Sequence, residues 1–134
     1  MPVSKDQARD IAKEFLELSH ELGTYRFSNW AKLTSSQRRQ IEDAEWDLLN
    51  YSGSFVTTAV GIALADMDND LKTIAQATSR AKKAVAAVKT VKGVINVAAA
   101  LVVLGGAIAS QNPATILSAA GDVLEAVQEA TKQG

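Results

Sequence analysis

The residues best suited to chemistry in this chain lie in the segment Asp66–Asp70, where three aspartates alternate with methionine and asparagine. Alternating carboxylates can gather oxygen ligands around Ca²⁺. A calcium loop of the EF-hand type that began at Asp66 would need glycine at its sixth position and a bidentate acid at its twelfth. This chain has Leu71 and Ala77 there. We therefore interpret the segment as a helix bend or cap with solvated carboxylates.

The remaining reactive residues are few and scattered. His20 is the only histidine and no cysteine is present, so neither a multi-ligand metal site nor a nucleophilic triad can be assembled from the usual residues. The acidic run Glu42–Asp47 is typical of a solvated helix face. Gly105-Gly106 lacks the lysine that follows the glycines of a phosphate loop. The sequence thus predicts no enzyme, no cofactor and no metal.

The charged residues are sorted along the chain, although the net charge is only −1. All charges from Glu42 to Asp70 are acidic, all charges from Lys72 to Lys92 are basic, and Val94–Gly121 has none. Such a balance gives no global field for nucleic acid, so no nucleic-acid partner is expected. The basic run either meets anionic lipid head groups or pairs with the acidic run Glu42–Asp47, and charge alone leaves both open.

Helical spacing of apolar residues predicts two helices in the first half of the chain. The first runs from Ser4 to about Leu22 and ends at Gly23. Thr34 and Gln37 form the capping box of the second, which is expected to end near Gly53. The aromatic residues of the connector, Tyr25, Phe27 and Trp30, either close the end of a core or lie at a membrane interface.

The second half predicts one long helix and a shorter one. Apolar spacing of three, four or seven continues from Phe55 to Ser110 with no proline, although a bend near Gly61, Asp68 or Gly93 is compatible with the pattern. Asn112-Pro113 indicates a restart, and the last helix is expected from Pro113 to about Lys132, antiparallel to the one before. We therefore expect one all-α domain over residues 1–134. It would be an elongated bundle of about four helices with one long central helix and a C-terminal apolar antiparallel hairpin.

The uncharged stretch Val94–Gly121 is either a membrane segment or the spine of a bundle. A lone span would need about 20 apolar residues and would have to tolerate Lys92 and Asn96. As two arms of a hairpin, the stretch could insert together. A helix that is apolar all round is equally typical of a bundle core.

The pattern from Leu71 to Ala120 combines Ala-Thr-rich heptads, lysines, an apolar Ala/Val/Gly run and then Asn-Pro: LKTIAQATSRAKKAVAAVKTVKGVINVAAALVVLGGAIASQNPATILSAA. It resembles the region leading into and through the apolar segment of cytolysin A-type α-helical pore-forming toxins and their multi-component relatives. The resemblance implies an elongated helix bundle in which an apolar segment is shielded in the soluble form and exposed to enter a bilayer.

The leading hypothesis is therefore a membrane-associating helical protein, a pore-forming toxin or toxin component, that inserts an apolar helical hairpin and forms a homo- or hetero-oligomer. Residues expected to contact lipid or partner helices are Val94, Ile95, Val97, Leu101, Val102, Val103, Leu104 and Ile108. Residues expected to meet head groups are Lys82, Lys83, Lys89 and Lys92.

Two alternatives remain. In the first, a soluble interaction or assembly protein buries the hairpin in its own bundle or in a homo-oligomer. In the second, the chain is a holin-like integral membrane protein. The N-terminal segment has no uninterrupted apolar core of a cleavable signal, so export would use another route. The compartment is otherwise open.

Overall fold

The computed structural model describes residues 5–57, 68–87, 90–110 and 113–133. They form five α-helices: α1 (Lys5–Ser28), α2 (Ser35–Thr57), α3 (Asp68–Ala87), α4 (Val91–Ser110) and α5 (Pro113–Gln133). A single 3-10 turn, Trp30–Lys32, lies between α1 and α2. No strand occurs in these residues, and the predicted all-α class is confirmed.

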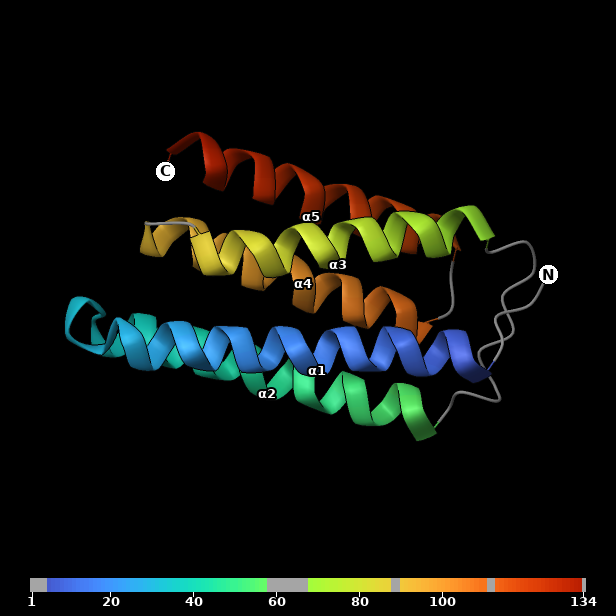
Figure 1. The fold of residues 1–134 in the computed structure, drawn as a ribbon, viewed down its shortest axis with the longest axis horizontal. Coiled ribbons are helices and arrows are strands. Elements are labelled where there is room, and N and C mark those ends of the chain that lie inside the picture. Colours follow the sequence, from blue (N-terminus) through green and yellow to red (C-terminus); the bar gives the residue numbers. More distant parts are fainter. Residues whose placement is uncertain (1–4, 58–67, 88–89, 111–112, 134) are drawn as a thin grey trace.

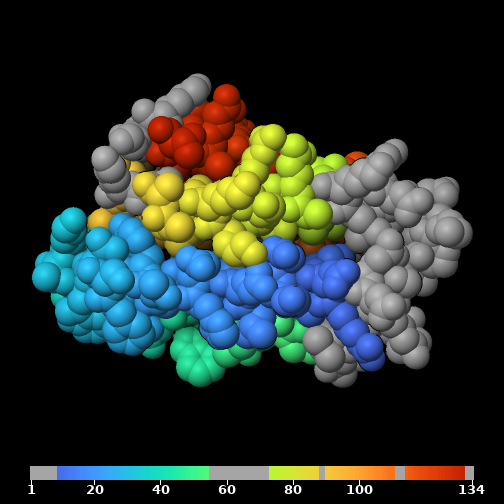
Figure 2. Space-filling model, in the orientation of Figure 1, coloured from blue at the N-terminus to red at the C-terminus, as the bar shows by residue number. Residues whose placement is uncertain are grey.

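The five helices lie alongside one another, and each runs in the direction opposite to the helix before it (Figure 1). Helix α1 packs against α2 and α3, α2 also packs against α4, and α5 packs against α3 and α4. On the face shown in Figure 2, α1 and α3 cover most of α4. Helix α4, the most apolar of the described helices, is therefore enclosed by α1 and α3 on this side.

The prediction that glycines end the first two helices is wrong. Helix α1 continues through Gly23 to Ser28, and α2 continues through Gly53 to Thr57. An internal glycine costs a helix about 1 kcal/mol relative to alanine. Tertiary packing exceeds this cost in α1, because the extra turn brings buried Tyr25 into the core.

The capping box predicted for the second helix is confirmed. The Thr34 N–H donates to Gln37 Oε1 at 2.9 Å, and the Gln37 N–H donates to Thr34 Oγ1 at 3.1 Å. These two bonds satisfy donors that the first turn of a helix leaves without a backbone partner. The start of the first helix, expected at Ser4, lies outside the described residues.

The prediction of one long helix from Phe55 to Ser110 is also wrong. Helix α3 ends at Ala87, Thr90 is not helical, and α4 runs back antiparallel to α3 (Figure 1). Thr90 caps α4, because its Oγ1 accepts the Gly93 N–H at 3.2 Å and its carbonyl accepts the Val94 N–H at 3.2 Å. Folding back lets the apolar α4 bury its side chains, which a continuous helix would leave in water.

Of the three positions at which a bend was predicted, one coincides with a helix boundary, because α3 begins at Asp68. Gly93 is buried inside α4, Asp68 is the first residue of α3, and Gly61 lies outside the described residues. The predicted last helix corresponds to α5, which begins at Pro113 and lies antiparallel to α4 (Figure 1). The described helices therefore number five rather than four.

Candidate membrane or partner interface

Helix α4 is the one helix among the described residues that is long and apolar enough to cross a bilayer by length and composition, and half of it is buried within the bundle. Its only charged residue is Lys92. A mostly buried core helix of a soluble protein meets the same criterion, so the faces of α4 have to be considered separately.

Most of the apolar side chains predicted to contact lipid or a partner lie in the core of this bundle. Five of them are no more than 2% exposed: Val94, Val97, Leu101, Leu104 and Ile108. These five side chains cannot meet lipid or another protein while the bundle is closed. Any such contact requires α4 to leave its neighbours.

The other three predicted contacts, Ile95, Val102 and Val103, lie toward the surface. Ile95 and Val102 are half-buried, and Val103 is 57% exposed. Ile95 and Val102 line a groove of about 330 Å³ between α4 and α2, together with Ala98 and Ala99. The α2 wall of the groove is formed by Gln40, Asp43, Ala44 and Asp47. The groove thus has an apolar wall on α4 and two carboxylates on α2.

Sequence reasoning did not identify Asp43 and Asp47 as part of this groove. The signal was present in the acidic run, because Ala44 and Leu48 are spaced by four residues and are both buried. Because Ala44 and Leu48 point inward, Asp43 and Asp47 must lie on the outer or lateral faces of α2. That these faces border α4 follows only from the packing of the two helices.

Gly105 is a point of close approach between α4 and the first two helices. A Cβ atom at this position would lie 2.5 Å from Cδ2 of Tyr51 and 2.9 Å from Cε2 of Phe15. The absence of a side chain therefore allows the rings of α1 and α2 to lie directly on the α4 backbone.

The four predicted head-group lysines have different surroundings. Lys82 on α3 is half-buried, and its Nζ donates to Glu17 on α1 and lies 3.5 Å from Glu14 Oε2. Lys83 and Lys92 are exposed. Lys89 lies outside the described residues.

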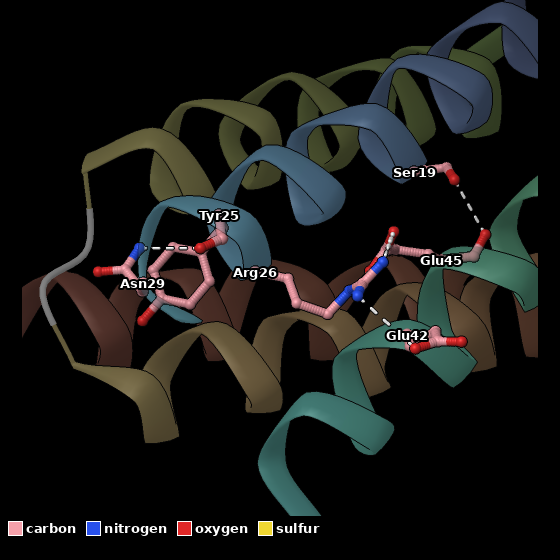
Figure 3. A network of polar contacts seen from close by, with 6 residues as sticks. All are labelled: Ser19, Tyr25, Arg26, Asn29, Glu42 and Glu45. Carbon is pink, nitrogen blue, oxygen red and sulfur yellow. Dashed lines mark hydrogen bonds and ion pairs between the residues drawn. The ribbon is translucent and has the colours of Figure 1, made fainter. Parts of the chain in front are cut away.

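One reading of the sequence paired the basic run with the acidic run Glu42–Asp47. In the structure, Lys82 of the basic run pairs instead with Glu14 and Glu17 of α1. Within the acidic run it is Arg26 of α1 that pairs with α2 (Figure 3). Arg26 Nε donates to Glu45 Oε2 at 2.6 Å, and its Nη1 lies 3.6 Å from Glu42 Oε2. The hydrogen bond with Glu45, more than the charges of Glu45 and Glu42, raises the pKa of Arg26 above its ordinary value.

Two further bonds attach α1 to α2. The Ser19 hydroxyl donates to the Glu45 carbonyl oxygen at 2.9 Å, and the buried Ser52 hydroxyl donates to the Ala12 carbonyl oxygen at 2.7 Å. Together with Arg26, these contacts run along the length of the α1–α2 pair. Charged bonds such as that of Arg26 are worth about 1.5–3 kcal/mol. The α1–α2 pair is therefore a hairpin with its own polar attachments.

The contact between Lys82 and Glu17 predicts an acid-sensitive attachment of α3 to α1. The hydrogen bond from Lys82 is the main cause that lowers the pKa of Glu17 below its ordinary value of 4.5, and the same bond raises the pKa of Lys82 above 10.5. A carboxyl whose pKa is lowered on folding stabilises the folded state above its unfolded pKa, and this stability is lost as the pH falls through the folded value.

We therefore expect Glu17→Gln to reduce the loss of stability that the wild-type protein shows on acidification below pH 4.5. The variant should differ little from wild type below the folded pKa of Glu17, where the wild-type carboxyl is already protonated. Urea unfolding measured between pH 2 and pH 7 provides the test, with Glu21→Gln on the same helix as the control. Equal acid sensitivity of wild type and Glu17→Gln would contradict the assignment.

The described residues contain no group of three or more His, Asp or Glu side chains able to hold a metal ion. His20 is exposed. The side chains of Asp66–Asp70, considered above as calcium ligands, lie outside the described ones. The arrangement that the structure does provide is a shielded apolar helix beside a partly apolar surface groove.

Comparison with known proteins identifies no relative, because no family model, curated protein or solved structure matches the chain. The function has to be inferred from the geometry of the bundle.

Proposed function

We propose that this five-helix bundle associates with membranes by releasing the α4–α5 hairpin and inserting it into the bilayer. The observation that supports the proposal most directly is the character of α4. This helix has 20 residues and a single charged residue, and the neighbouring helices partly shield it from water. A membrane-spanning helix requires about this length. Shielding of such a helix keeps the closed form soluble.

The distribution of polar contacts fits this release. Lys82 attaches α3 to α1, while Arg26, Ser19 and Ser52 attach α1 to α2. All of these attachments would stay intact if α4 and α5 moved away together. The mutual packing of α4 and α5 would also be kept, because the two helices follow one another in the chain and lie side by side (Figure 1).

Only the first part of α5 is suited to insertion. Pro113–Gly121 contains no charged residue, whereas Asp122, Glu125 and Glu129 follow on the exposed surface. A carboxylate at the centre of a bilayer is disfavoured by about 3 kcal/mol. The inserted segment would therefore comprise α4 and the first turns of α5, and the C-terminal turns would stay in water.

Release of the hairpin would leave apolar surface on α1, α2 and α3 uncovered. Phe15, Leu18 and Leu48 are fully buried in the closed bundle. Exposed apolar patches of this kind are covered in stable proteins by other subunits or by lipid. We therefore propose that the inserted form is a homo- or hetero-oligomer, with a pore as its most direct consequence.

The substitution Val103→Asp tests insertion without unfolding the closed bundle, because Val103 is largely exposed. The aspartate would lie within the inserted segment and is expected to lower insertion roughly a hundredfold. Leu49→Asp on α2 is the matched control, since Leu49 is also an exposed large apolar residue but lies outside the hairpin. Flotation with anionic vesicles measures membrane association, and dye release from the same vesicles measures pore formation.

Insertion of α4 is supported if Val103→Asp abolishes dye release while Leu49→Asp behaves like wild type. The proposal fails if wild-type protein never floats with vesicles at any pH or salt concentration, or if the two variants lose activity equally.

The second candidate is a soluble interaction or assembly protein whose hairpin stays closed. The groove between α2 and α4 favours it, because a partner could contact Ile95 and Val102 without any opening of the bundle. In this case Val103→Asp, whose site follows Val102 of the groove in the chain, would weaken association in detergent-free buffer without vesicles. Sedimentation velocity distinguishes this outcome from loss of insertion.

A further inference from the structure

Two exposed aromatic rings at the turn between α1 and α2 are held between two arginines. The rings of Phe27 and Trp30 are nearly parallel, with an angle of 12° and centroids 6.2 Å apart. The guanidinium of Arg26 lies 4.6 Å from the centroid of Phe27, and that of Arg38 lies 4.2 Å from the centroid of Trp30. Such cation–π contacts stabilise a fixed arrangement of the rings.

Hydrogen bonds hold the same stack to the backbone. Arg38 donates from Nε and Nη2 to the Trp30 carbonyl oxygen at 3.1 and 2.6 Å. The Asn29 amide donates to the Tyr25 carbonyl oxygen at 2.9 Å and closes the end of α1 (Figure 3). Although they are held in place, Phe27 is 68% exposed and Trp30 is 45% exposed. Large apolar rings kept rigidly in water at the end of a bundle indicate a contact surface.

The segment of the chain that carries this stack is basic, although acids of α2 lie close to it: Glu42 and Glu45 beside Arg26, and Glu42 and Asp43 beside Arg38 and Arg39. Between Glu21 and Glu42 the chain contains four cations and no acid: Arg26, Lys32, Arg38 and Arg39. Arg26 is engaged by Glu45, but Lys32 and Arg39 are exposed. We define these residues, with Phe27 and Trp30, as the α1–α2 tip. The last turn of α3 and the first turn of α4 lie at the same end of the bundle (Figure 1), and exposed Lys92 is the second residue of α4.

The rest of this end is less basic, because Glu125 and Glu129 of α5 lie beside Gly93 of α4. The cationic and aromatic part of the end is therefore the α1–α2 tip itself. Exposed aromatic rings beside arginine and lysine are typical of protein segments that lie in the interfacial region of a bilayer.

We propose that the α1–α2 tip is the surface by which the protein first docks on an anionic lipid bilayer. The proposal rests on the proposed function and adds the step that precedes insertion. A lipid surface fits better than single-stranded nucleic acid, because base stacking needs free ring faces. In the tip, a guanidinium already lies over one face of each ring, which leaves less ring face for a base. The exposed parts of both rings can enter the head-group region of a bilayer beside the cations.

Docking by the tip can be measured with the two tryptophans of the chain, Trp30 and Trp46. Trp46 is exposed on α2, about 17 Å along the helix from its first residue. The variant Trp46→Phe leaves Trp30 as the reporter, and Trp30→Phe leaves Trp46. In vesicles of phosphatidylglycerol and brominated phosphatidylcholine, we expect the emission of Trp30 to shift to the blue and to be quenched, and that of Trp46 to stay unchanged.

A matched pair of charge variants tests whether the tip itself binds. Each basic residue near an anionic surface contributes about a fivefold increase in binding. Lys32→Gln with Arg39→Gln is therefore expected to weaken vesicle binding about 25-fold. Arg9→Gln with Lys13→Gln removes the same charge from exposed positions in the first half of α1 and should leave binding close to wild type.

Three results would overturn docking by the tip: equal quenching of both tryptophans, equal loss of binding by the two double variants, or no vesicle binding. A change of Trp30 emission with a thymidine oligonucleotide but not with vesicles would also overturn it and would favour nucleic acid. Quenching of Trp30 without dye release would support docking and contradict insertion. Dye release without quenching of Trp30 would support insertion and contradict this route of docking.

Discussion

Replacement of Leu104 by aspartate is expected to unfold the bundle in detergent-free buffer. Leu104 is fully buried on α4, within the core shared with the other helices. Loss of a buried leucine side chain alone destabilises a protein by about 2–5 kcal/mol. An unpaired buried carboxylate adds several kcal/mol more, or takes up a proton at a similar cost. Because small domains have a total stability of about 5–15 kcal/mol, the sum is enough to unfold this one.

Far-ultraviolet circular dichroism and urea unfolding measure this effect. The adjacent substitution Val103→Asp is the control, because Val103 is 57% exposed and its aspartate can stay in water. We expect Val103→Asp to change stability by less than about 1 kcal/mol. If Leu104→Asp unfolded cooperatively with nearly wild-type stability, α4 would not be the core helix of the closed form.

Substitution of two glycines by alanine is expected to change stability in opposite directions. In Gly105→Ala the new methyl group would meet the rings of Tyr51 and Phe15 at distances no real Cβ contact shows. Phe15 is fully buried, so its ring does not border solvent into which it could move aside. Overpacking of this kind destabilises a core by about 1–3 kcal/mol, which exceeds the gain of up to about 1 kcal/mol from the better helix propensity of alanine.

Gly121→Ala is the matched variant, because Gly121 also lies inside a helix but no atom lies within 4 Å of its added Cβ. Helix propensity then acts alone and should stabilise the protein by about 0.5–1 kcal/mol. Thermal unfolding should show a lower Tm for Gly105→Ala and a Tm about 2–4 °C higher for Gly121→Ala. A higher Tm for both variants would show that α4 does not approach α1 and α2 closely.

The sequence predicted local features whose causes are local. The capping box of Thr34 and Gln37 involves residues three apart, and the start of the last helix at Pro113 follows from the fixed backbone angle of proline. Apolar spacing correctly indicated the all-helical fold of the described residues. The errors occurred at the ends of elements, where Gly23 and Gly53 are helical and the turn at Thr90 was not foreseen.

The turn at Thr90 had a local signal, since threonine is a favoured cap residue. Helical spacing continues across it without a break, so the pattern could not distinguish one long helix from two. The preference for two arises from burial, because α4 covers its apolar face only by folding back onto the bundle. The free energy gained by this burial depends on residues that are distant in sequence.

The sequence by itself determined that the chain is helical, that one segment is uncharged and long enough to span a bilayer, and where the last two helices are separated. Only the tertiary structure decided which side of that segment is shielded. Leu101 and Leu104 are buried while neighbouring Val103 is exposed. Arg26 on α1 forms a hydrogen bond with Glu45 on α2. The physical reason is that helical periodicity defines the faces of each helix, whereas the neighbour of each face depends on how all five helices pack together.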